Sequence, residues 1–291
     1  MPEISLGLPK GSLQESTFGL LRDAGWAFRT PERSYYPAVD DPEIRAMLAR
    51  PQEMSRYVER GALDAAITGR DWTLEAGSEV EIAAELVYAK ASRRPVRWVL
   101  AVPEDSPMRE PADLEGKVVA TEVVRLAERF FAERGVRPRR VDFSHGATEV
   151  KVPHLADAIV DLTESGDSLR ANRLREVATV QESVTVMIAN KDAWKDPWKR
   201  AKIEAVILML QGVLAAKRKV LLKLNAPSSG LEAIVRALPA LHAPTVSALS
   251  SPGWHAVETV ADQREARDLI PKLKALGAEG IFTLSPGVVV P

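Results

Sequence analysis

Short apolar segments alternate with amphipathic segments through roughly the first 190 residues, and this alternation constrains the fold more than any other feature. Strands that alternate with helices favour an α/β fold, in which helices cover the faces of largely parallel sheets. A turn at residues 9–12 leads from the first strand into a helix, and a second helix is predicted over residues 123–134. The strands that we predict in this part are residues 4–8, 65–68, 96–102, 117–121, 156–162 and 185–189.

The pattern changes after residue 219. A helix that begins at Asp196-Pro197 separates the two parts, with an acidic N-cap and proline at its first position. Beyond it we predict strands at residues 220–224, 245–250, 254–260 and 281–284, and helices over residues 229–238, capped by Pro227-Ser228-Ser229, and 262–276. The order βαββαβ is typical of a ferredoxin-like module. Pro271 lies inside the last helix and predicts a kink there.

Composition excludes several classes of function. The chain has 291 residues, 39 basic and 40 acidic, with a net charge of −1, so no overall field favours nucleic acid or a membrane surface. It contains no cysteine, which excludes disulfides, thiolate catalysis and thiolate metal sites. The N-terminal residues lack a basic segment followed by a long apolar stretch, so we expect no secretory signal and a cytoplasmic protein.

A candidate phosphate site lies at residues 157–169, where an apolar run meets a Thr/Ser/Gly turn and then a helix start. Free backbone N–H groups and hydroxyls at such a turn bind anions, and Gly166 allows a close approach. An ordinary helix N-cap, with Asp167 or Ser168 as the cap, is the alternative. The carboxylates of Glu164 and Asp167 would repel a bare phosphate, so they fit better with a ligand that also carries ribose hydroxyls or a metal ion.

Other candidate groups lie at strand ends, where ligands gather in open α/β sheets. Lys10 follows the first strand and suits a polyphosphate; a surface lysine is the equally weighted alternative. Arg70 and Asp71 follow the strand at residues 65–68, and their alternative is an internal ion pair. Arg50 and the pair at residues 93–94 are further anion candidates. The four histidines show no metal-ligand spacing.

Taken together, these segments resemble the long-form ATP phosphoribosyltransferases over essentially the whole chain. One departure is a segment at residues 151–155 that lacks a glycine and is shorter; another is serine at positions 165 and 168, where threonine is usual. The motifs that carry the resemblance are LPKGSL (8–13), PQEMSRYVERGALDAAITGRD (51–71), GATEV (146–150), ADAIVDLTESGDSLRAN (156–172) and the module that starts with KVLLKLNAP (219–227).

The resemblance implies a glycosyltransferase that joins N1 of ATP to C1′ of phosphoribosyl pyrophosphate, releases pyrophosphate and starts histidine biosynthesis. It implies a two-lobed catalytic core similar to periplasmic binding proteins, followed by a C-terminal ferredoxin-like regulatory domain. The expected bounds are 1–92 with 183–216 for the first lobe, 93–182 for the second lobe with the phosphate turn, and 217–291 for the regulatory domain. Mg²⁺ is the expected cofactor, held mainly by substrate oxygens, with protein ligands left undefined.

The resemblance also implies roles for individual residues. In the catalytic core, Lys10, Arg50 and Asp71 are the candidate catalytic residues, and Gly11 and Arg70 are the candidate ATP contacts. For phosphoribosyl pyrophosphate the candidates are Asp161 and Glu164, on the ribose hydroxyls, and Ser165, Gly166, Asp167, Ser168 and Leu169, on the 5′-phosphate.

Histidine is the expected feedback inhibitor, and a homo-oligomer, either a dimer or a hexamer, is the expected assembly. An assembly module without a ligand is the alternative for the C-terminal part. Asn225 stands where relatives can have aspartate, so histidine inhibition is expected to be weaker. The effector residues that the resemblance implies are Asn225, Leu241, Thr245, Val260 and Gly280.

Two other functions remain open from the residues alone. One is a solute- or nucleotide-binding protein of the periplasmic-binding-protein fold without catalysis. The other is a phosphoribosyltransferase that acts on another base. Release of pyrophosphate separates the first from an enzyme, and a comparison of acceptor bases separates the second.

Overall fold

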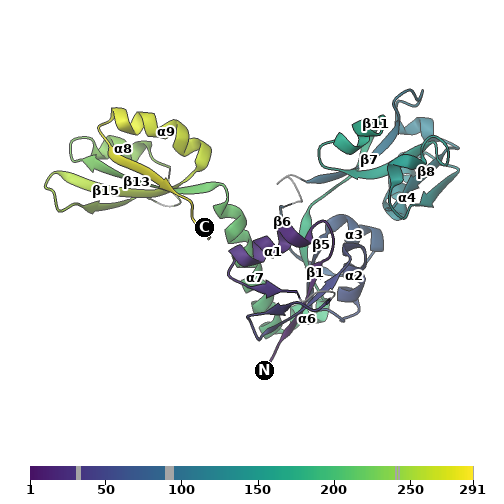
Figure 1. Cartoon of the computed structure of the whole chain (residues 1–291), viewed down its shortest axis with the longest axis horizontal. Helices are drawn as coiled ribbons and strands as arrows, with labels where there is room; N and C mark the ends of the chain where they lie inside the picture. The colour runs from purple at the N-terminus through teal and green to yellow at the C-terminus, as the bar shows by residue number, and fades with distance from the viewer. Residues whose placement is uncertain (31–33, 89–94, 240, 242, 291) are drawn as a thin grey trace. The chain divides into compact units, whose positions relative to one another are not determined.

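The computed structural model describes residues 1–30, 34–88, 95–239, 241 and 243–290. The chain divides into two compact units: Met1–Gly19 with Ala27–Ala205, and Leu20–Trp26 with Val206–Pro291. The first unit holds two five-stranded sheets and the second holds a four-stranded sheet (Figure 1). None of the helices in the described ranges has the length and apolar character that a bilayer crossing requires.

The first sheet is built on a parallel core. Its strands are β1 (Ile4–Pro9), β4 (Ile44–Ala49), β5 (Ala65–Gly69), β6 (Glu81–Leu86) and β12 (Thr185–Ala189), in the order β4-β1-β5-β12-β6. β1 runs parallel to β4 and β5, and β12 runs antiparallel to β5 and β6. Every residue of β1 and β12 is buried, which explains why both are largely apolar. The accompanying helices are α1 (Gln14–Asp23), α2 (Pro51–Glu59), α3 (Arg70–Ala76) and α6 (Lys191–Lys195), and a small hairpin comprises β2 (Phe28–Arg29) and β3 (Ala38–Val39).

The second sheet has the order β11-β7-β10-β8-β9. Its strands are β7 (Val96–Pro103), β8 (Val118–Thr121), β9 (Arg140–Phe143), β10 (Ala158–Thr163) and β11 (Leu174–Ser183). The helical segments of this region are α4 (Val124–Ala132), α5 (Asp167–Ala171) and the 3₁₀ turns at Pro111–Leu114 and Thr148–Lys151. Phe130 and Phe131 of α4 pack with Trp98 and Leu100 of β7 in the core of this region. Because β10 runs parallel to β8, the polar residues that follow both strands reach the same edge of the sheet.

The third sheet is entirely antiparallel, in the order β14-β15-β13-β16. The elements are β13 (Lys219–Pro227), α8 (Leu231–Ala237), β14 (Thr245–Ala248), β15 (Trp254–Asp262), α9 (Gln263–Ala275) and β16 (Glu279–Leu284). Val220, Leu222, Leu224 and Ala226 alternate with less buried residues along β13, as a sheet covered by helices on one face requires. The predicted ferredoxin-like βαββαβ order is confirmed, and Pro271 lies within an α9 that continues through it.

The sequence predicted the inner strands of the two five-stranded sheets and missed the strands at their edges. β12 has the predicted bounds, and α7 (Pro197–Ala216) begins at its proline, with Asp196 accepting hydrogen bonds from the amides of residues 198 and 199 at 2.9 and 3.0 Å. The cap predicted for α8 at residues 227–229 is wrong, because Gly230 precedes its first residue. No strand was predicted at β2, β3, β4, β6, β9 or β11. The three-domain division stays a prediction, since the two compact units divide the chain within α7.

Candidate functional site

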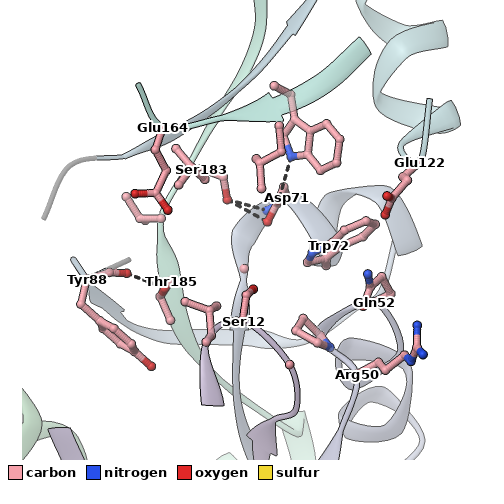
Figure 2. A pocket seen from close by; sticks show the side chains of 18 of the residues that line it. Ser12, Arg50, Gln52, Asp71, Trp72, Tyr88, Glu122, Glu164, Ser183 and Thr185 are labelled. Carbon is pink, nitrogen blue, oxygen red and sulfur yellow. Dashed lines mark hydrogen bonds between the residues drawn. The ribbon is translucent and has the colours of Figure 1, made fainter. Parts of the chain in front are cut away.

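A cavity of about 890 Å³ lies in the first unit and is lined by residues from both five-stranded sheets. Figure 2 shows its polar side chains arriving from strand ends and from the helices that follow them. The lining residues are Lys10, Gly11, Ser12, Leu13, Tyr35, Arg50, Pro51, Gln52, Gly69, Asp71, Trp72, Val87, Tyr88, Val96, Trp98, Glu122, Asp161, Leu162, Glu164, Ser168, Ser183, Val184 and Thr185.

The predicted phosphate turn connects β10 to α5. Gly166 has φ of 81°, a left-handed conformation that favours glycine, and its amide donates to Thr163 Oγ1 at 2.8 Å. The amides of Ser168 and Leu169 donate to no acceptor within the described residues. Gly166 itself is the N-cap and has no side-chain cap bond, so the alternative of Asp167 or Ser168 as the cap is wrong. The turn therefore presents unused backbone donors.

Side chains around the turn show which groups reach the cavity. Glu164 and Ser168 line it, whereas Ser165, Gly166, Asp167 and Leu169 do not. Ser165 Oγ donates to Asp167 Oδ2 at 2.5 Å, and Asp167 also pairs with Arg170, so the Asp167 carboxylate is neutralised locally. Arg170 Nη2 donates to the carbonyl of Ser165 at 3.1 Å. Sequence reasoning missed this arginine, which places a positive charge over the turn.

Asp161 lies on β10 and faces the same cavity. The pKa of its carboxyl is raised to about 6, chiefly by burial and also by the negative charges of Glu149 and Glu122, against the lowering effect of a hydrogen bond from the amide of Leu162 at 2.9 Å. Glu149 in turn accepts a hydrogen bond from Ser168 Oγ at 2.7 Å. The cavity thus holds an acidic wall beside the phosphate turn.

Basic groups lie at the ends of the first sheet's strands. Lys10 Nζ lies 3.6 Å from the centroid of the Tyr35 ring, and Lys10 and Gly11 both line the cavity. Gly11 has φ of 107°, so the turn after β1 requires a glycine there. Arg50 precedes Pro51 at the start of α2 and has no ion pair within the described residues. Lys10 and Arg50 are therefore available to an anionic ligand; residues 93–94 lie outside the described residues.

The structure corrects the predicted relation between Arg70 and Asp71. Asp71 is buried and accepts hydrogen bonds from Trp98 Nε1 at 2.6 Å and Ser183 Oγ at 2.8 Å (Figure 2). Burial raises the pKa of Asp71, while the hydrogen bonds from Trp98 and Ser183 lower it. Arg70 pairs instead with Glu85 at 2.8 Å and does not line the cavity. The two neighbours do not pair with one another, and Asp71 joins α3 to β7 and β11.

Aromatic residues that the sequence did not single out form part of the wall. The rings of Trp72 and Trp98 meet edge to face, with centroids 5.6 Å apart and an interplanar angle of 86°. Tyr88 is buried, and its hydroxyl lies 2.8 Å from Thr17 Oγ1. Tryptophans within separate predicted elements give no signal that they meet, because the contact depends on how two sheets are connected.

A smaller cavity of about 340 Å³ adjoins the first and shares part of its wall. The shared residues are Arg50, Gln52, Trp72 and Glu122, and the smaller cavity adds Glu53, Arg56, Glu75, Ala76, Phe143, Ser144 and His145. Glu75 accepts hydrogen bonds from the amides of Arg125 and Leu126 at 3.0 and 2.9 Å, so it caps α4. Among the described residues, no group of three or more His, Asp or Glu side chains is arranged to hold a metal ion.

The predicted effector residues lie in the second unit. Asn225 and Val260 occupy the less buried positions of β13 and β15, opposite to the side chains that pack under α8 and α9. A Cβ atom on Gly280, which has φ of 55°, would lie 3.2 Å from Asn225 Nδ2. Thr245 pairs with Glu258 across β14 and β15, and Leu241 is exposed between α8 and β14. Asn225 and Gly280 are therefore neighbours, as a shared site requires.

Comparisons with known proteins agree with one another. The family model described as ATP phosphoribosyltransferase matches residues 50–212, and that of the HisG C-terminal domain matches residues 216–285. The chain is 57% identical to an ATP phosphoribosyltransferase of Chlorobium phaeovibrioides, over 96% of this chain and 95% of that protein. It is 49% identical to one of Pelotomaculum thermopropionicum, over 99% of this chain and 100% of that protein.

A solved structure supports the fold alone. It is a chain of the ATP phosphoribosyl transferase (HisG:HisZ) complex from Thermotoga maritima, with a TM-score of 0.61 and 23% sequence identity. The match covers 72% of this chain and 98% of that chain.

Proposed function

The chain belongs to the ATP phosphoribosyltransferase family, the transferases that begin histidine biosynthesis, and from that premise we propose how its cavity joins ATP to phosphoribosyl pyrophosphate. The single observation that carries the proposal is the turn between β10 and α5. Its unused amides, at Ser168 and Leu169, lie beside a cavity that also holds acidic and basic walls. A sugar carrying a 5′-phosphate and a pyrophosphate needs all three kinds of group.

The turn at residues 163–169 binds the 5′-phosphate. Amides of Ser168 and Leu169 supply donors, and Gly166 keeps the backbone accessible. The guanidinium of Arg170 lies at the turn, where it donates to the carbonyl of Ser165 and pairs with Asp167. Because Asp167 is paired with Arg170 and Ser165, its carboxylate does not oppose the phosphate.

Asp161 and Glu164 accept hydrogen bonds from the ribose hydroxyls. Both line the cavity next to the phosphate turn, and a sugar held by its phosphate would bring its hydroxyls to them. The pKa of Asp161 is about 6, so most of this carboxyl is ionised at neutral pH and accepts rather than donates. A carboxylate near C1′ also favours the positive charge that develops there when the pyrophosphate leaves.

Lys10 and Arg50 bind the pyrophosphate or the triphosphate of ATP, with the backbone of Gly11 beside them. Neither cation has an ion pair within the described residues, so a polyanion gains their charge without breaking a native pair. Asp71 acts as a positioning residue, since its carboxylate is engaged by Trp98 and Ser183. Arg70 is held by Glu85 and lies outside the cavity wall, which does not support a direct ATP contact.

Mg²⁺ is the metal that we propose. Since no described group of three acidic or histidine side chains is arranged for a metal, Asp161 and Glu164 would hold it only together with substrate oxygens, as Mg²⁺ sites on phosphorylated substrates commonly do. When bound, it would neutralise charge on the departing pyrophosphate. The residues of this chain meanwhile align N1 of adenine with C1′ and exclude water from the sugar.

One assay tests the reaction. The protein is incubated with ATP, Mg²⁺ and phosphoribosyl pyrophosphate, and pyrophosphate release is followed with time. We expect release that depends on ATP, with little from free adenine, GTP or orotate. Equal or better use of another base would refute the choice of ATP, and binding without release would indicate a solute-binding protein.

Histidine regulates the enzyme through the four-stranded sheet of the second unit. Support comes from the adjacency of Asn225 and Gly280 and from the match to the HisG C-terminal domain. A chain truncated after Lys217 should lose histidine inhibition, and retained inhibition would locate the effector elsewhere.

A homo-oligomeric assembly, dimer or hexamer, is part of the same proposal and is measured by light scattering on the full chain with and without histidine.

A further inference from the structure

Glu122 occupies the wall that the two cavities share. It directly follows β8, and Thr121 of β8 is in register with Val160 of the parallel strand β10. Glu122 therefore reaches the same sheet edge as Asp161 and the phosphate turn. Figure 2 shows its carboxylate on the side of the cavity that holds Trp72, Gln52 and Arg50.

The carboxylate of Glu122 has neither a hydrogen bond nor an ion pair within the described residues. In contrast, the Asp71 carboxylate accepts from Trp98 and Ser183, and that of Glu75 caps α4. Glu164 lines only the larger cavity and Glu53 only the smaller, so Glu122 is the carboxylate that both walls contain. A half-buried carboxylate without a native partner is available to a donor on a ligand.

The proposed function assigns the ribose hydroxyls of phosphoribosyl pyrophosphate to Asp161 and Glu164, and the substrates offer few other donors for such a group. Their phosphates carry negative charge and would be repelled by Glu122, whereas adenine presents the N6 amino group next to N1 on the same edge. When N1 forms its bond to C1′, the C1′–O bond breaks and its electron pair leaves with pyrophosphate. The adenine ring then carries a positive charge shared between N1 and N6, which makes the N6–H groups stronger donors.

Building on the proposed function, we propose that Glu122 accepts a hydrogen bond from N6 of ATP and stabilises the positive charge that the adenine ring gains as N1 is alkylated. The proton stays on N6, so no base or acid is consumed. Trp72, which also lies in both walls, offers an aromatic face beside the ring. Because the interaction strengthens as the charge develops, it raises kcat more than it tightens ATP binding.

The same contact gives base specificity. Guanine and hypoxanthine carry a carbonyl oxygen at position 6, and this acceptor would face the acceptor oxygens of Glu122. A site built around a required hydrogen bond discriminates strongly against a base that cannot form it. Glu122 is thus both a catalytic and a specificity-determining residue.

The test is a cycle of two nucleotides and two enzymes. ATP and purine riboside triphosphate, which keeps N1 but lacks the amino group, are compared in the wild type and in Glu122→Gln by pyrophosphate release. With ATP, the variant should lose about 10- to 100-fold in kcat; with the purine analogue, its loss should stay within about 3-fold. Equal losses with both nucleotides overturn the proposal.

Glu164→Gln is the matched control, because Glu164 lines the larger cavity alone. Glu164→Gln should raise KM for phosphoribosyl pyrophosphate, and the rise should be the same with both nucleotides. Glu122→Asp keeps the charge and should recover part of the rate with ATP. If thermal melting shows that Glu122→Gln is unfolded, Glu122→Asp replaces it in the comparison of the two nucleotides. Failure of the wild type to release pyrophosphate from ATP refutes the proposed function, whereas an active wild type with equal losses refutes only the role of Glu122.

Discussion

Two strand-end turns border the same cavity, and the polar groups of one are hydrogen-bonded while two amides of the other are free within the part of the chain that the structure describes. After β5, Asp71 is buried and its carboxylate is occupied by Trp98 and Ser183. After β10, the amides of Ser168 and Leu169 have no partner within the described residues, and Asp161 keeps a raised pKa of about 6. The difference teaches that a conspicuous acid at a strand end can be structural, while a less conspicuous set of amides is left open for a ligand.

The largest expected effect comes from closing the open turn. Gly166→Val introduces a β-branched side chain at φ of 81°, and its Cβ would lie 2.8 Å from Arg170 Nη1. We expect kcat/KM for phosphoribosyl pyrophosphate to fall by about 1,000-fold or more, because the amides can no longer approach the phosphate. Thermal melting should show a folded protein, and unchanged kcat and KM would refute the role of the turn.

Removal of the Asp71 carboxylate should lower the stability of the fold. Asp71→Ala leaves Trp98 Nε1 and Ser183 Oγ without their buried acceptor, so we expect a loss of about 2–4 kcal/mol in the free energy of unfolding, measured by urea denaturation. Asp71→Asn keeps an acceptor and should lose less. If Asp71→Ala abolished activity with stability unchanged, a direct catalytic role would replace the positioning role.

The raised pKa of Asp161 should make the stability of the protein depend on pH. Its pKa is about 6 in the folded chain against 3.8 as the reference, so the folded state binds this proton more tightly. Its contribution to stability therefore falls as pH rises from about 4 to about 6, and the cost persists at pH 7. Asp161→Asn should raise the free energy of unfolding at pH 7 by about 1–2 kcal/mol and leave it unchanged near pH 3.

Asp161→Asn should also lower the catalytic activity. We expect kcat/KM for phosphoribosyl pyrophosphate to lose its dependence on a group with an apparent pKa of about 6. A variant that is no more stable than the wild type at pH 7 and keeps the wild-type pH profile would contradict both the burial cost and the proposed contact with ribose.

Arg70 should show the smallest effect. Its pair with Glu85 is solvent-exposed, so Arg70→Ala should change the free energy of unfolding by less than about 1 kcal/mol, measured by urea denaturation. Because Arg70 does not line the cavity, KM for ATP should stay within about 2-fold of the wild type. A large rise in KM would restore it as an ATP contact.

The sequence predicted the elements whose burial leaves a continuous signal. β12 is entirely buried and largely apolar, and its bounds were predicted without error. β11 was missed because most of its positions are half-buried and carry polar side chains, so it shows neither an apolar run nor a clean alternation. In the two five-stranded sheets, local patterns therefore identify the inner strands and lose the strands at the edges, whereas the edge strands β14 and β16 of the third sheet were predicted.

The site was predictable only in its local parts. The phosphate turn is one continuous segment, so its residues could be assigned together. Asp71 and Ser183 are 112 residues apart in sequence, and their hydrogen bond depends on how the first unit folds. The meeting of Trp72 with Trp98 and the place of Glu122 in two cavity walls have the same origin. Such contacts leave no local pattern in the chain.

The most direct measurement is a crystal structure of the protein with phosphoribosyl pyrophosphate. We predict that oxygens of the 5′-phosphate lie about 3 Å from the amide nitrogens of Ser168 and Leu169. A 5′-phosphate bound at Lys10 or Arg50, with these amides still free, would contradict the account.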